Sequence, residues 1–155
     1  MPLQIESFDL AHVAETVIKE AQMIDGGHDF SCVLSPVMVE ADTTLIKQAM
    51  RILVDNAIKY TPIGGEIKIT LDTDNGYARV CVQDTGIGIP PEAVSRIFDR
   101  FYRADESRAR ATGGTGLGLS IAKWIVDRHR GHLDVLSRED LGTRISIMIP
   151  ALNKK

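Results

Sequence analysis

The segment whose residue types and spacing most clearly suggest a chemical function spans residues 113–122, which read GGTGLGLSIA. It places four glycines ahead of an amphipathic helical pattern. Glycine lets backbone N–H groups approach a ligand closely, and at a helix N-terminus the unpaired donors and the helix dipole favour an anion. The segment therefore predicts a loop that wraps a chain of phosphates. Taken alone, it is equally compatible with a flexible glycine-rich loop before an ordinary surface helix.

Two commoner glycine motifs do not fit this segment. A P-loop requires a lysine directly after its last glycine, and Leu119 stands there after Gly118. A dinucleotide fingerprint requires a glycine or alanine where Ile121 stands, and a strand ahead of it, whereas residues 108–112 have no strand character. Both kinds of site are excluded.

A carboxamide lies on the apolar side of a long predicted helix. Asn56 follows Leu53 by three residues and Ala49 by seven, and an unpaired polar group at such a position is costly. Its partner is either a backbone group, as for an ordinary buried asparagine, or Mg²⁺, which takes few protein oxygens and completes its shell with phosphate and water. Lys59 and Tyr60 follow one turn later and could reach the same phosphates.

A lone carboxylate ends a later strand, in the run DTGIGIP at residues 84–90. The glycines Gly86 and Gly88 allow the backbone to fit closely beside Asp84, whose oxygens can only accept hydrogen bonds while it is ionised. This arrangement suits an exocyclic amine as ligand. A solvated turn aspartate is the alternative.

Aromatic and cationic residues alternate in the run FDRFYR at residues 98–103. The aromatic side chains could anchor a mobile lid while a guanidinium faces phosphate oxygens. A loop that binds another protein is the alternative for this run.

Length, charge and composition limit the classes of fold and function that the chain can have. The 155 residues, a quarter of them charged, predict one globular domain over 1–155. A net charge of −3 provides no basic surface for nucleic acid or for an anionic membrane. No apolar run approaches the roughly 20 residues that span a bilayer. Cys32 and Cys81 lie in apolar, strand-like runs, so we expect buried reduced thiols in place of a disulfide or a metal site.

The patterns around these motifs alternate between helical and extended periods. Asp9 is expected to cap the first helix and Asp42 or Thr43 the second. The tripeptide 74–76 favours a hairpin turn, and the first two strands are expected to pair as a hairpin around residues 35–36. The pattern favours an α/β fold, a two-layer sandwich of helices on one face of a mixed sheet. We expect helices over 9–23, 43–60, 91–98 and 117–130, and strands over 30–34, 37–41, 67–71, 78–82, 133–136 and 143–149.

Four motifs, in order, resemble the catalytic, ATP-binding domain of bacterial sensor histidine kinases. Residues 56–62 (NAIKYTP) are similar to the N box of that family, 84–88 (DTGIG) to the G1 box, 97–103 (IFDRFYR) to the F box and 114–119 (GTGLGL) to the G2 box. The resemblance extends from Phe8 to Thr143, which is nearly the whole chain, and four ordered motifs are far more specific than one.

The resemblance implies a Bergerat-type (GHKL) α/β sandwich that binds ATP and Mg²⁺ between the long helix and a flexible lid. It implies that Asn56 holds the metal, that Lys59, Tyr60 and Arg103 contact phosphates, and that Asp84 accepts from the adenine amine. Asn56, Lys59 and Arg103 are then the catalytic residues. The implied nucleotide-binding set is Asn56, Lys59, Tyr60, Asp84, Gly86, Gly88, Ile89, Arg103, Gly114, Thr115, Gly116, Leu117, Gly118, Leu119 and Thr143.

One position departs from the relatives of this superfold. Gyrase-like, MutL-like and Hsp90-like ATPases carry a water-activating glutamate one turn before the asparagine, where Ile52 stands in this chain. Isoleucine accepts no proton, which disfavours efficient ATP hydrolysis. Histidine kinases often carry a second asparagine there, so one metal or solvent contact is missing.

The family transfers the γ-phosphoryl group to a histidine on a dimeric helical hairpin. None of His12, His28, His129 and His132 lies in the H-E-x-x-x-P setting of that acceptor, and we expect all four to be ordinary, partly exposed imidazoles. The resemblance therefore implies a separate phosphoacceptor and dimerisation domain of the same kinase, and a response-regulator receiver domain as a later partner. It also implies a cytoplasmic domain of a membrane-anchored parent, without direct membrane or nucleic-acid contact.

Two other functions stay open for the chain. It could be a nucleotide-dependent interaction module without catalysis, in which ATP only orders the lid, or a stand-alone hydrolase of the same superfold.

Overall fold

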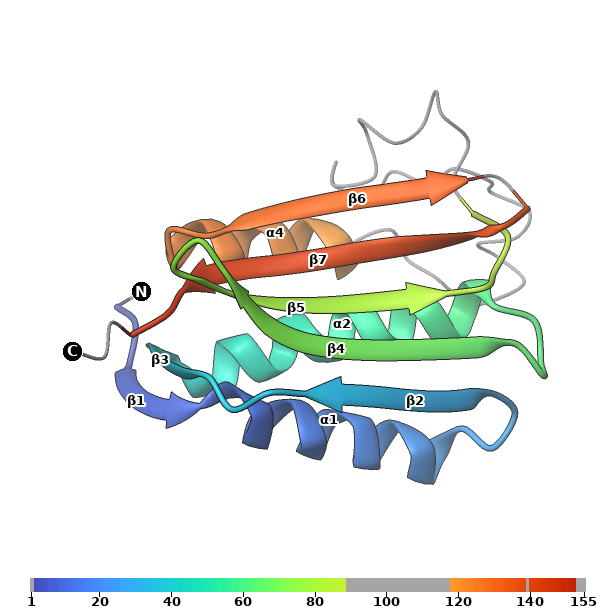
Figure 1. Cartoon of the computed structure of the whole chain (residues 1–155), viewed down its shortest axis with the longest axis horizontal. Coiled ribbons are helices and arrows are strands. Elements are labelled where there is room, and N and C mark those ends of the chain that lie inside the picture. Colours follow the sequence, from blue (N-terminus) through green and yellow to red (C-terminus); the bar gives the residue numbers. More distant parts are fainter. Residues whose placement is uncertain (1, 89–117, 139, 153–155) are drawn as a thin grey trace.

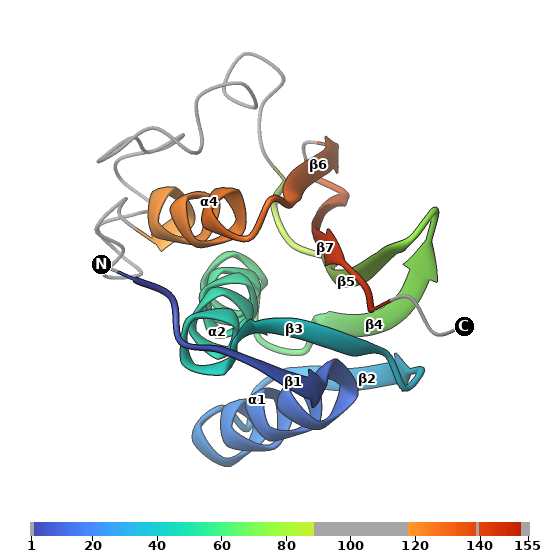
Figure 2. The ribbon, with the colours of Figure 1, turned by 90° about the vertical axis from the view of Figure 1, so that its left-hand side faces the viewer.

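The protein folds into two layers, with helices packed against one face of a sheet (Figures 1 and 2). The structure is a computed structural model, and it describes residues 2–88, 118–138 and 140–152. The elements in chain order are β1 (Ile5–Asp9), α1 (Leu10–Ile24), β2 (Asp29–Leu34), β3 (Met38–Asp42), α2 (Thr43–Tyr60), β4 (Glu66–Asp74), β5 (Tyr77–Asp84), α4 (Gly118–Arg128), β6 (His132–Arg138) and β7 (Gly142–Pro150).

The main sheet has the strand order β2-β4-β5-β7-β6. The β2 strand runs parallel to β4, and the other neighbours are antiparallel. The strands β1 and β3 form a separate antiparallel pair. Figure 2 shows α1, α2 and α4 together on one side of the main sheet. The predicted two-layer sandwich on a mixed sheet is thereby confirmed.

The core lies between the helices and the helix-facing side of the main sheet. Alternate residues of the strands point to this side, because successive side chains of a strand point to opposite faces. In α1 and α2 the buried positions recur at helical spacing. The buried core residues on the strands of the main sheet are Ile67, Ile69, Leu71, Ala78, Val80, Val82, Ile145, Ile147 and Ile149.

The two predicted helix caps are present. Asp9 accepts the amide of Ala11 at 3.0 Å at the start of α1. Asp42 accepts the amide of Leu45 at 3.1 Å at the start of α2, so the cap is Asp42 and not Thr43. The α2 helix ends at Tyr60, as predicted.

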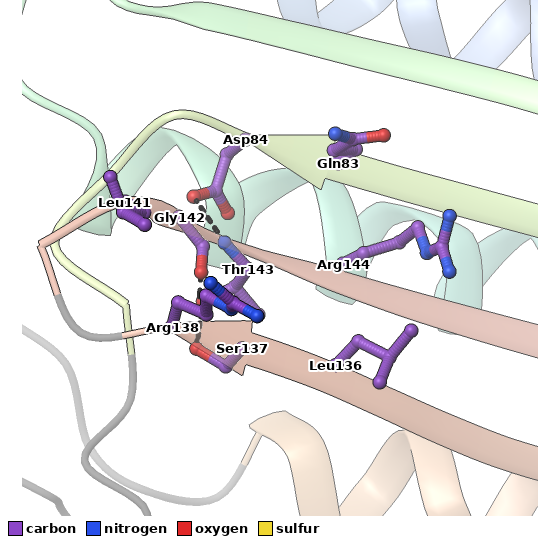
Figure 3. A pocket seen from close by; sticks show the side chains of 9 residues that line it. All are labelled: Gln83, Asp84, Leu136, Ser137, Arg138, Leu141, Gly142, Thr143 and Arg144. Carbon is purple, nitrogen blue, oxygen red and sulfur yellow. Dashed lines mark hydrogen bonds between the residues drawn. The ribbon is translucent and has the colours of Figure 1, made fainter.

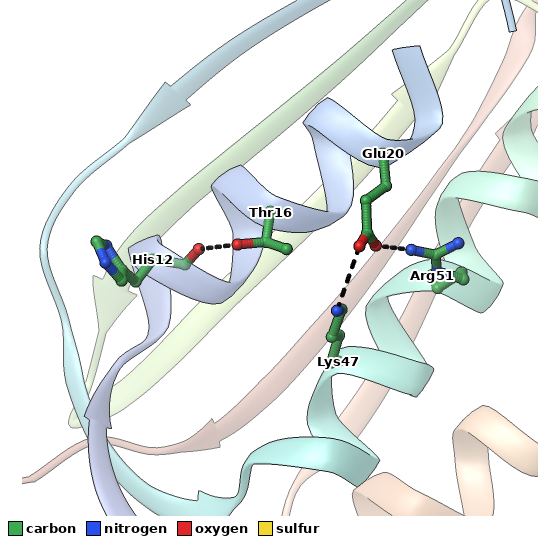
Figure 4. A network of polar contacts seen from close by, with 5 residues as sticks. All are labelled: His12, Thr16, Glu20, Lys47 and Arg51. Carbon is green, nitrogen blue, oxygen red and sulfur yellow. Dashed lines mark hydrogen bonds and ion pairs between the residues drawn. The ribbon is translucent and has the colours of Figure 1, made fainter. Parts of the chain in front are cut away.

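Helices α1 and α2 are also joined by a polar network on their solvent side (Figure 4). The Glu20 carboxylate of α1 pairs with Lys47 at 3.5 Å and with Arg51, both on α2. All three side chains are more than a third exposed, and such pairs contribute at most about 1 kcal/mol each. The buried apolar faces of the two helices therefore contribute most of the stability of this contact.

The predicted hairpin at residues 74–76 is confirmed. The strands β4 and β5 are joined by Asn75 and Gly76, whose φ angles of 52° and 84° are both positive. Two residues with positive φ match the right-handed twist of a two-residue hairpin loop.

The predicted hairpin of residues 30–34 and 37–41 is wrong. The β2 strand pairs with β4 as a parallel neighbour, and β3 pairs with β1, a strand over residues 5–9 that the sequence analysis missed. The chain still follows β4 at Ser35, whose amide donates to the Leu71 carbonyl at 3.0 Å. Further on, in β3, Val39 and Ala41 are both buried at 0 % exposure. Burial of these apolar residues beneath the helices replaces the local turn.

The cysteines were expected to be buried, and this expectation is also wrong. Cys32 is exposed because β2 is an edge strand, and Cys81 is half-buried on the open face of the sheet. Since Cys32 pairs in register with the core residue Ile69 and Cys81 with Thr70, the two thiols point to opposite faces. Both cysteines are free. The expected short helix over 91–98 lies outside the described residues.

Candidate nucleotide site

The β5 strand places Asp84 at its C-terminal end, where the side chain is only 8 % exposed. One carboxylate oxygen, Oδ1, accepts the amide of Gly86 at 2.9 Å. The same oxygen accepts the amide of Thr143 at 3.3 Å (Figure 3). The other oxygen, Oδ2, has no hydrogen bond to any residue that the structure describes. The carboxylate is therefore fixed by one oxygen and can accept a ligand donor with the other.

Burial raises the pKa of the Asp84 carboxyl group above its usual value. Hydrogen bonds from the amides of Gly86 and Thr143 oppose this rise in pKa without cancelling it. The Thr61 hydroxyl lies near the carboxyl group without a hydrogen bond to it and also favours the charged form. A buried acceptor that lacks a full set of donors is costly in the free protein. A ligand amine would remove that cost, which makes this end of β5 a candidate site for a hydrogen-bond donor.

Two glycines let the backbone close around Asp84. A Cβ atom on Gly86 would lie 2.2 Å from the Tyr60 carbonyl oxygen, and a Cβ atom on Gly142 would lie 2.1 Å from the Asp84 carbonyl oxygen. Gly142 also has a φ of 139°, a region that favours glycine. Neither position can hold a side chain without a backbone shift.

The loop after β5 is tied to the end of α2. The amide of Ile87 donates to the Tyr60 carbonyl at 3.1 Å, and the amide of Asp140 donates to the Ile87 carbonyl at 2.6 Å. Lys59 and Tyr60 therefore lie next to the loop that holds Asp84. The three segments 59–60, 84–88 and 140–143, which are far apart in the sequence, meet at one end of the sheet.

Thr143 lies opposite Asp84 in the register of β5 and β7. Its buried hydroxyl is 2.9 Å from that of Ser137 on β6. Thr143 thus lies beside Asp84, and its contact with adenine stays a prediction.

Asn56 is half-buried on α2, one turn before Tyr60. Its carboxamide has no hydrogen bond to any described residue, so the backbone-bonded alternative is not what the structure shows. Gly118 begins α4 close to Ile52, since a Cβ atom on it would lie 3.4 Å from Ile52 Cγ2. The start of α4 and Leu119 therefore pack beside the turn of α2 that precedes Asn56.

The other predicted site residues lie partly within and partly outside the described part of the chain. Gly88 is described and has a positive φ of 74°. Ile89, Arg103, Gly114, Thr115, Gly116 and Leu117 lie outside the described residues.

A hollow of about 410 Å³ adjoins Asp84 at the ends of β5, β6 and β7 (Figure 3). The alternation of the strands places Gln83, Leu136, Arg138 and Arg144 on the open face of the sheet, away from the helices. The hollow is lined by Gln83, Asp84, Leu136, Ser137, Arg138, Leu141, Gly142, Thr143 and Arg144.

Thr61 was not predicted as a site residue, yet it is buried and lies near Asp84. It is 4 % exposed, and its Oγ1 atom has no hydrogen-bond partner among the described residues. It lies close enough to Asp84 to favour the charged carboxylate. The only sequence signal was its place directly after Tyr60 at the end of the helix.

Two of the four histidines are not partly exposed as expected. His129 is buried, donates from Nδ1 to the Ile125 carbonyl at 2.8 Å and accepts the Asp42 amide at Nε2 at 3.0 Å. This bond joins the end of α4 to the start of α2. The His28 side chain is 4 % exposed. Burial of these rings depends on contacts with residues distant in sequence, which no local pattern shows.

Comparison with known proteins identifies the family. A family model for the histidine kinase-, DNA gyrase B-, and HSP90-like ATPases matches residues 41–153. The chain belongs to this ATPase family. The predicted family is thus confirmed, and the match covers α2, the Asp84 loop, α4 and both final strands.

The similar proteins are histidine kinases. YkoH, a sensor histidine kinase of Bacillus subtilis, is 40 % identical over 157 residues, which cover 99 % of this chain and 34 % of YkoH. The phosphate regulon sensor protein PhoR of Pseudomonas aeruginosa is 43 % identical over 125 residues, 79 % of this chain and 28 % of PhoR. The chain therefore spans about a third of the length of these relatives.

Solved structures agree with this assignment. The mycobacterial sensor histidine kinase MprB superimposes with a TM-score of 0.84 at 30 % identity, over 97 % of this chain and 99 % of that one. The catalytic domain of the histidine kinase ThkA gives a TM-score of 0.81 at 34 % identity, over 96 % and 98 % of the two chains. This member of the ATPase family corresponds to the ATP-binding catalytic domain of sensor histidine kinases. Within its described part, no helix is long and apolar enough to cross a bilayer.

Proposed function

We propose that this catalytic domain binds ATP with Mg²⁺ and aligns the γ-phosphoryl group for transfer to a histidine on a separate domain of its parent kinase. The observation that carries the proposal is the buried Asp84, whose Oδ1 is held by two backbone amides while Oδ2 is unpartnered among the described residues. Adenine offers an exocyclic amine, the donor that such an oxygen requires.

The residues near Asp84 fit a nucleotide. Gly86 and Gly142 let the chain pass close to the carboxylate, and the buried Thr61 hydroxyl lacks a partner in the described part of the chain. Thr143 and the backbone at Gly88 complete the proposed adenine end. These groups orient the base and exclude water from it.

The phosphate end is proposed to lie along α2 and the start of α4. Asn56 supplies an unpaired carboxamide oxygen, a ligand type that Mg²⁺ accepts, and when bound the ion neutralises phosphate charge. Lys59 and Tyr60 follow on the same helix, and we assign the remaining phosphate contacts to Arg103 and to the backbone of residues 114–119. Phosphoryl transfer needs chiefly such alignment and charge neutralisation.

The proposed acceptor belongs to another domain. His28 and His129 are enclosed by hydrogen bonds within the fold, so a phosphoryl group could not reach them without local unfolding. We propose that the acceptor histidine lies on the dimerisation domain of the same kinase and that a receiver domain takes the phosphoryl group from it. The parent would be anchored in a membrane, with this domain on the cytoplasmic side.

Ile52 argues for transfer to a protein group over hydrolysis. Its half-buried aliphatic side chain lies against the start of α4 and can neither accept a proton nor orient water. The same feature favours a second candidate, an interaction module in which ATP orders the segment after Gly88 without chemistry. The two candidates differ in whether phosphate leaves the nucleotide.

A labelling experiment separates them. We expect the domain, supplied with the phosphoacceptor domain of its own parent and with Mg²⁺ and γ-labelled ATP, to label that domain. Firm Mg-ATP binding without labelling would favour the interaction module, and rapid phosphate release without the partner would favour a hydrolase.

The metal assignment has its own test. Asn56→Ala is expected to abolish the gain in ATP affinity that Mg²⁺ gives, with little effect on affinity in a chelator, because the carboxamide is lost while the adenine end is untouched. Titration of both proteins with ATP by calorimetry, with and without Mg²⁺, measures this difference. Unchanged metal dependence in Asn56→Ala would show that the ligand is another residue.

A further inference from the structure

His28 is a buried imidazole that joins the loop after α1 to the end of α2. Its Nδ1 lies 2.7 Å from Asp25 Oδ2, and its Nε2 lies 2.6 Å from the Thr61 carbonyl oxygen. The backbone supports this junction, because the amide of Gly64 donates to the Gly27 carbonyl at 2.6 Å. The ring therefore sits between two segments that are 33 or more residues apart.

Both ring nitrogens of His28 face atoms that accept hydrogen bonds. A carbonyl oxygen and an ionised carboxylate have no proton to donate, so each nitrogen must carry one, and the ring is an imidazolium. Burial lowers the pKa of His28, but the hydrogen bonds to the Thr61 carbonyl and to Asp25, with the charge of Asp25, outweigh it and raise the pKa above 6.5. The carbonyl end of α2 adds to this preference for a cation.

Asp25 is the only described charged group in direct contact with the ring. At the ends of the elements that meet here, the chain also carries Lys59 on α2, Asp29 on β2 and Glu66 on β4, and all three are exposed to solvent. Solvent screens charges at such positions. The state of the ring therefore depends chiefly on Asp25.

Thr61 extends from this junction into the proposed adenine site. Its carbonyl receives the His28 proton, while its buried hydroxyl lies near Asp84. Its neighbour Tyr60 accepts the amide of Ile87, in the loop that follows Asp84. Movement of Thr61 would thus displace both the hydroxyl and the loop.

We propose that the His28 imidazolium, paired with Asp25, is a positioning residue for nucleotide binding that acts through Thr61. With the ring charged, its Nδ1 proton binds Asp25 and its Nε2 proton binds the Thr61 carbonyl, which holds Thr61 so that its hydroxyl and Asp84 face the base together. With the ring neutral, one nitrogen bears a lone pair toward an acceptor oxygen, and the repulsion shifts Thr61. This inference rests on the proposed function, since it assumes that Asp84 and Thr61 bind adenine.

The test measures the affinity for ADP by calorimetry between about pH 5.5 and 9, the range in which a histidine titrates. For the unmodified domain we expect the affinity to fall about tenfold as the pH rises through the pKa of His28, the equivalent of ~1.4 kcal/mol. In Asp25→Asn the same fall should occur at lower pH, because the carboxylate no longer favours the cation. In His28→Gln the affinity should be low throughout, without this transition.

Two controls isolate the effect. His12 is exposed on α1, and His12→Gln is expected to retain the pH profile of the unmodified domain. The ionisation of the ADP phosphates is common to all four proteins, so it cancels when their affinities are compared at each pH. Thermal melting identifies any variant that fails to fold. If His28→Gln does not fold, Asp25→Asn still tests the proposal, because it preserves the shape of the junction.

Proton NMR of the His28 ring provides the independent readout. We expect the titration midpoint of the ring to lie above pH 6.5 in the unmodified domain and to decrease in Asp25→Asn. The pH profile of ADP affinity should shift in parallel. The titration midpoint of the His28 ring could shift in Asp25→Asn while the ratio of ADP affinities between this variant and the unmodified domain stays the same at every pH. That result overturns the positioning role and leaves the proposed function standing. If ADP fails to bind at every pH, the proposed function itself fails.

Discussion

At the scale of single residues, Asp84 shows a conflict between folding and binding. Its side chain is buried, and burial raises the pKa of the carboxyl group. The charged form therefore carries a free-energy penalty in the folded protein, which develops as the pH rises from about 4 through the raised pKa and persists above it. Retention of an ionised carboxylate under this penalty is expected at a site that serves a ligand.

Asp84→Asn should separate the two effects. The Asn Oδ1 must take the place that receives the amides of Gly86 and Thr143, so its NH₂ group replaces Oδ2 and meets the adenine amine donor to donor. We expect ATP affinity to fall on the order of 100-fold, while the free energy of unfolding of the ligand-free domain at pH 7 stays the same or rises. Calorimetry and urea unfolding measure the two quantities.

The pH dependence provides a check on this explanation. The stability gain of Asp84→Asn should vanish below about pH 4, where the aspartate is protonated in both the folded and the unfolded chain. A variant that loses stability at pH 7, or one that binds ATP normally, would contradict the assigned role.

At the scale of elements, α2 is the support for the site. Its N-terminus is fixed by Asp42, whose carboxylate accepts the amides of Gln4 at 3.0 Å and Leu45 at 3.1 Å. These two hydrogen bonds lower the pKa of Asp42, more than its burial raises it. Its C-terminus is fixed by the bond from Ile87 to Tyr60. The helix thus keeps Asn56, Lys59 and Tyr60 in a constant relation to Asp84.

Asp42→Ala is expected to lower the free energy of unfolding by about 1 kcal/mol or more, because two amides lose their acceptor. The contribution of Asp42 is present at neutral pH and decreases below about pH 4, as its carboxylate is protonated and the lowered pKa is passed. Urea unfolding at pH 7 and pH 3 measures this. We expect the difference between the unmodified protein and the variant to be smaller at pH 3, and an equal difference would contradict the charge-based account.

Gly86→Ala tests the junction between α2 and the Asp84 loop. The new methyl group would lie 2.2 Å from the Tyr60 carbonyl, so the loop must move away and the Ile87 bond breaks. We expect a loss of about 2 kcal/mol in the free energy of unfolding and a strong loss of ATP affinity. Gly26→Ala is the matched control, since nothing lies within 4 Å of its Cβ position, and it should be nearly neutral in both assays.

At the scale of the whole molecule, local patterns predicted the elements better than their pairing. Asp9 and Asp42 were found as caps because capping depends on neighbouring residues, and the turn at Asn75 was found for the same reason. The partner of β2 could not be found, because its parallel pairing with β4 requires the chain to cross over through β3 and α2, which no local pattern shows. The β1 strand was missed since its pattern is short and mostly exposed.

The candidate site divides in the same way. Asp84, Gly86 and Asn56 could be chosen from motifs of a few residues each, and the structure joins the loop of the first two to the end of the helix that carries the third. The burial of His28 and Thr61 could not be predicted, because it follows from a contact between the ends of α1 and α2. Residues that act through tertiary contacts leave no periodic signal.

The pairing of β5 with β7 has a consequence for synthesis of the chain. Asp84 and Thr143, which hold the proposed adenine site closed from two sides, are separated by 59 positions. During translation Asp84 is made long before Thr143, so the emerging polypeptide has no complete pocket until β7 has left the ribosome. ATP can then stabilise only the finished fold, and a premature stop before β7 should leave a product that nucleotide cannot rescue.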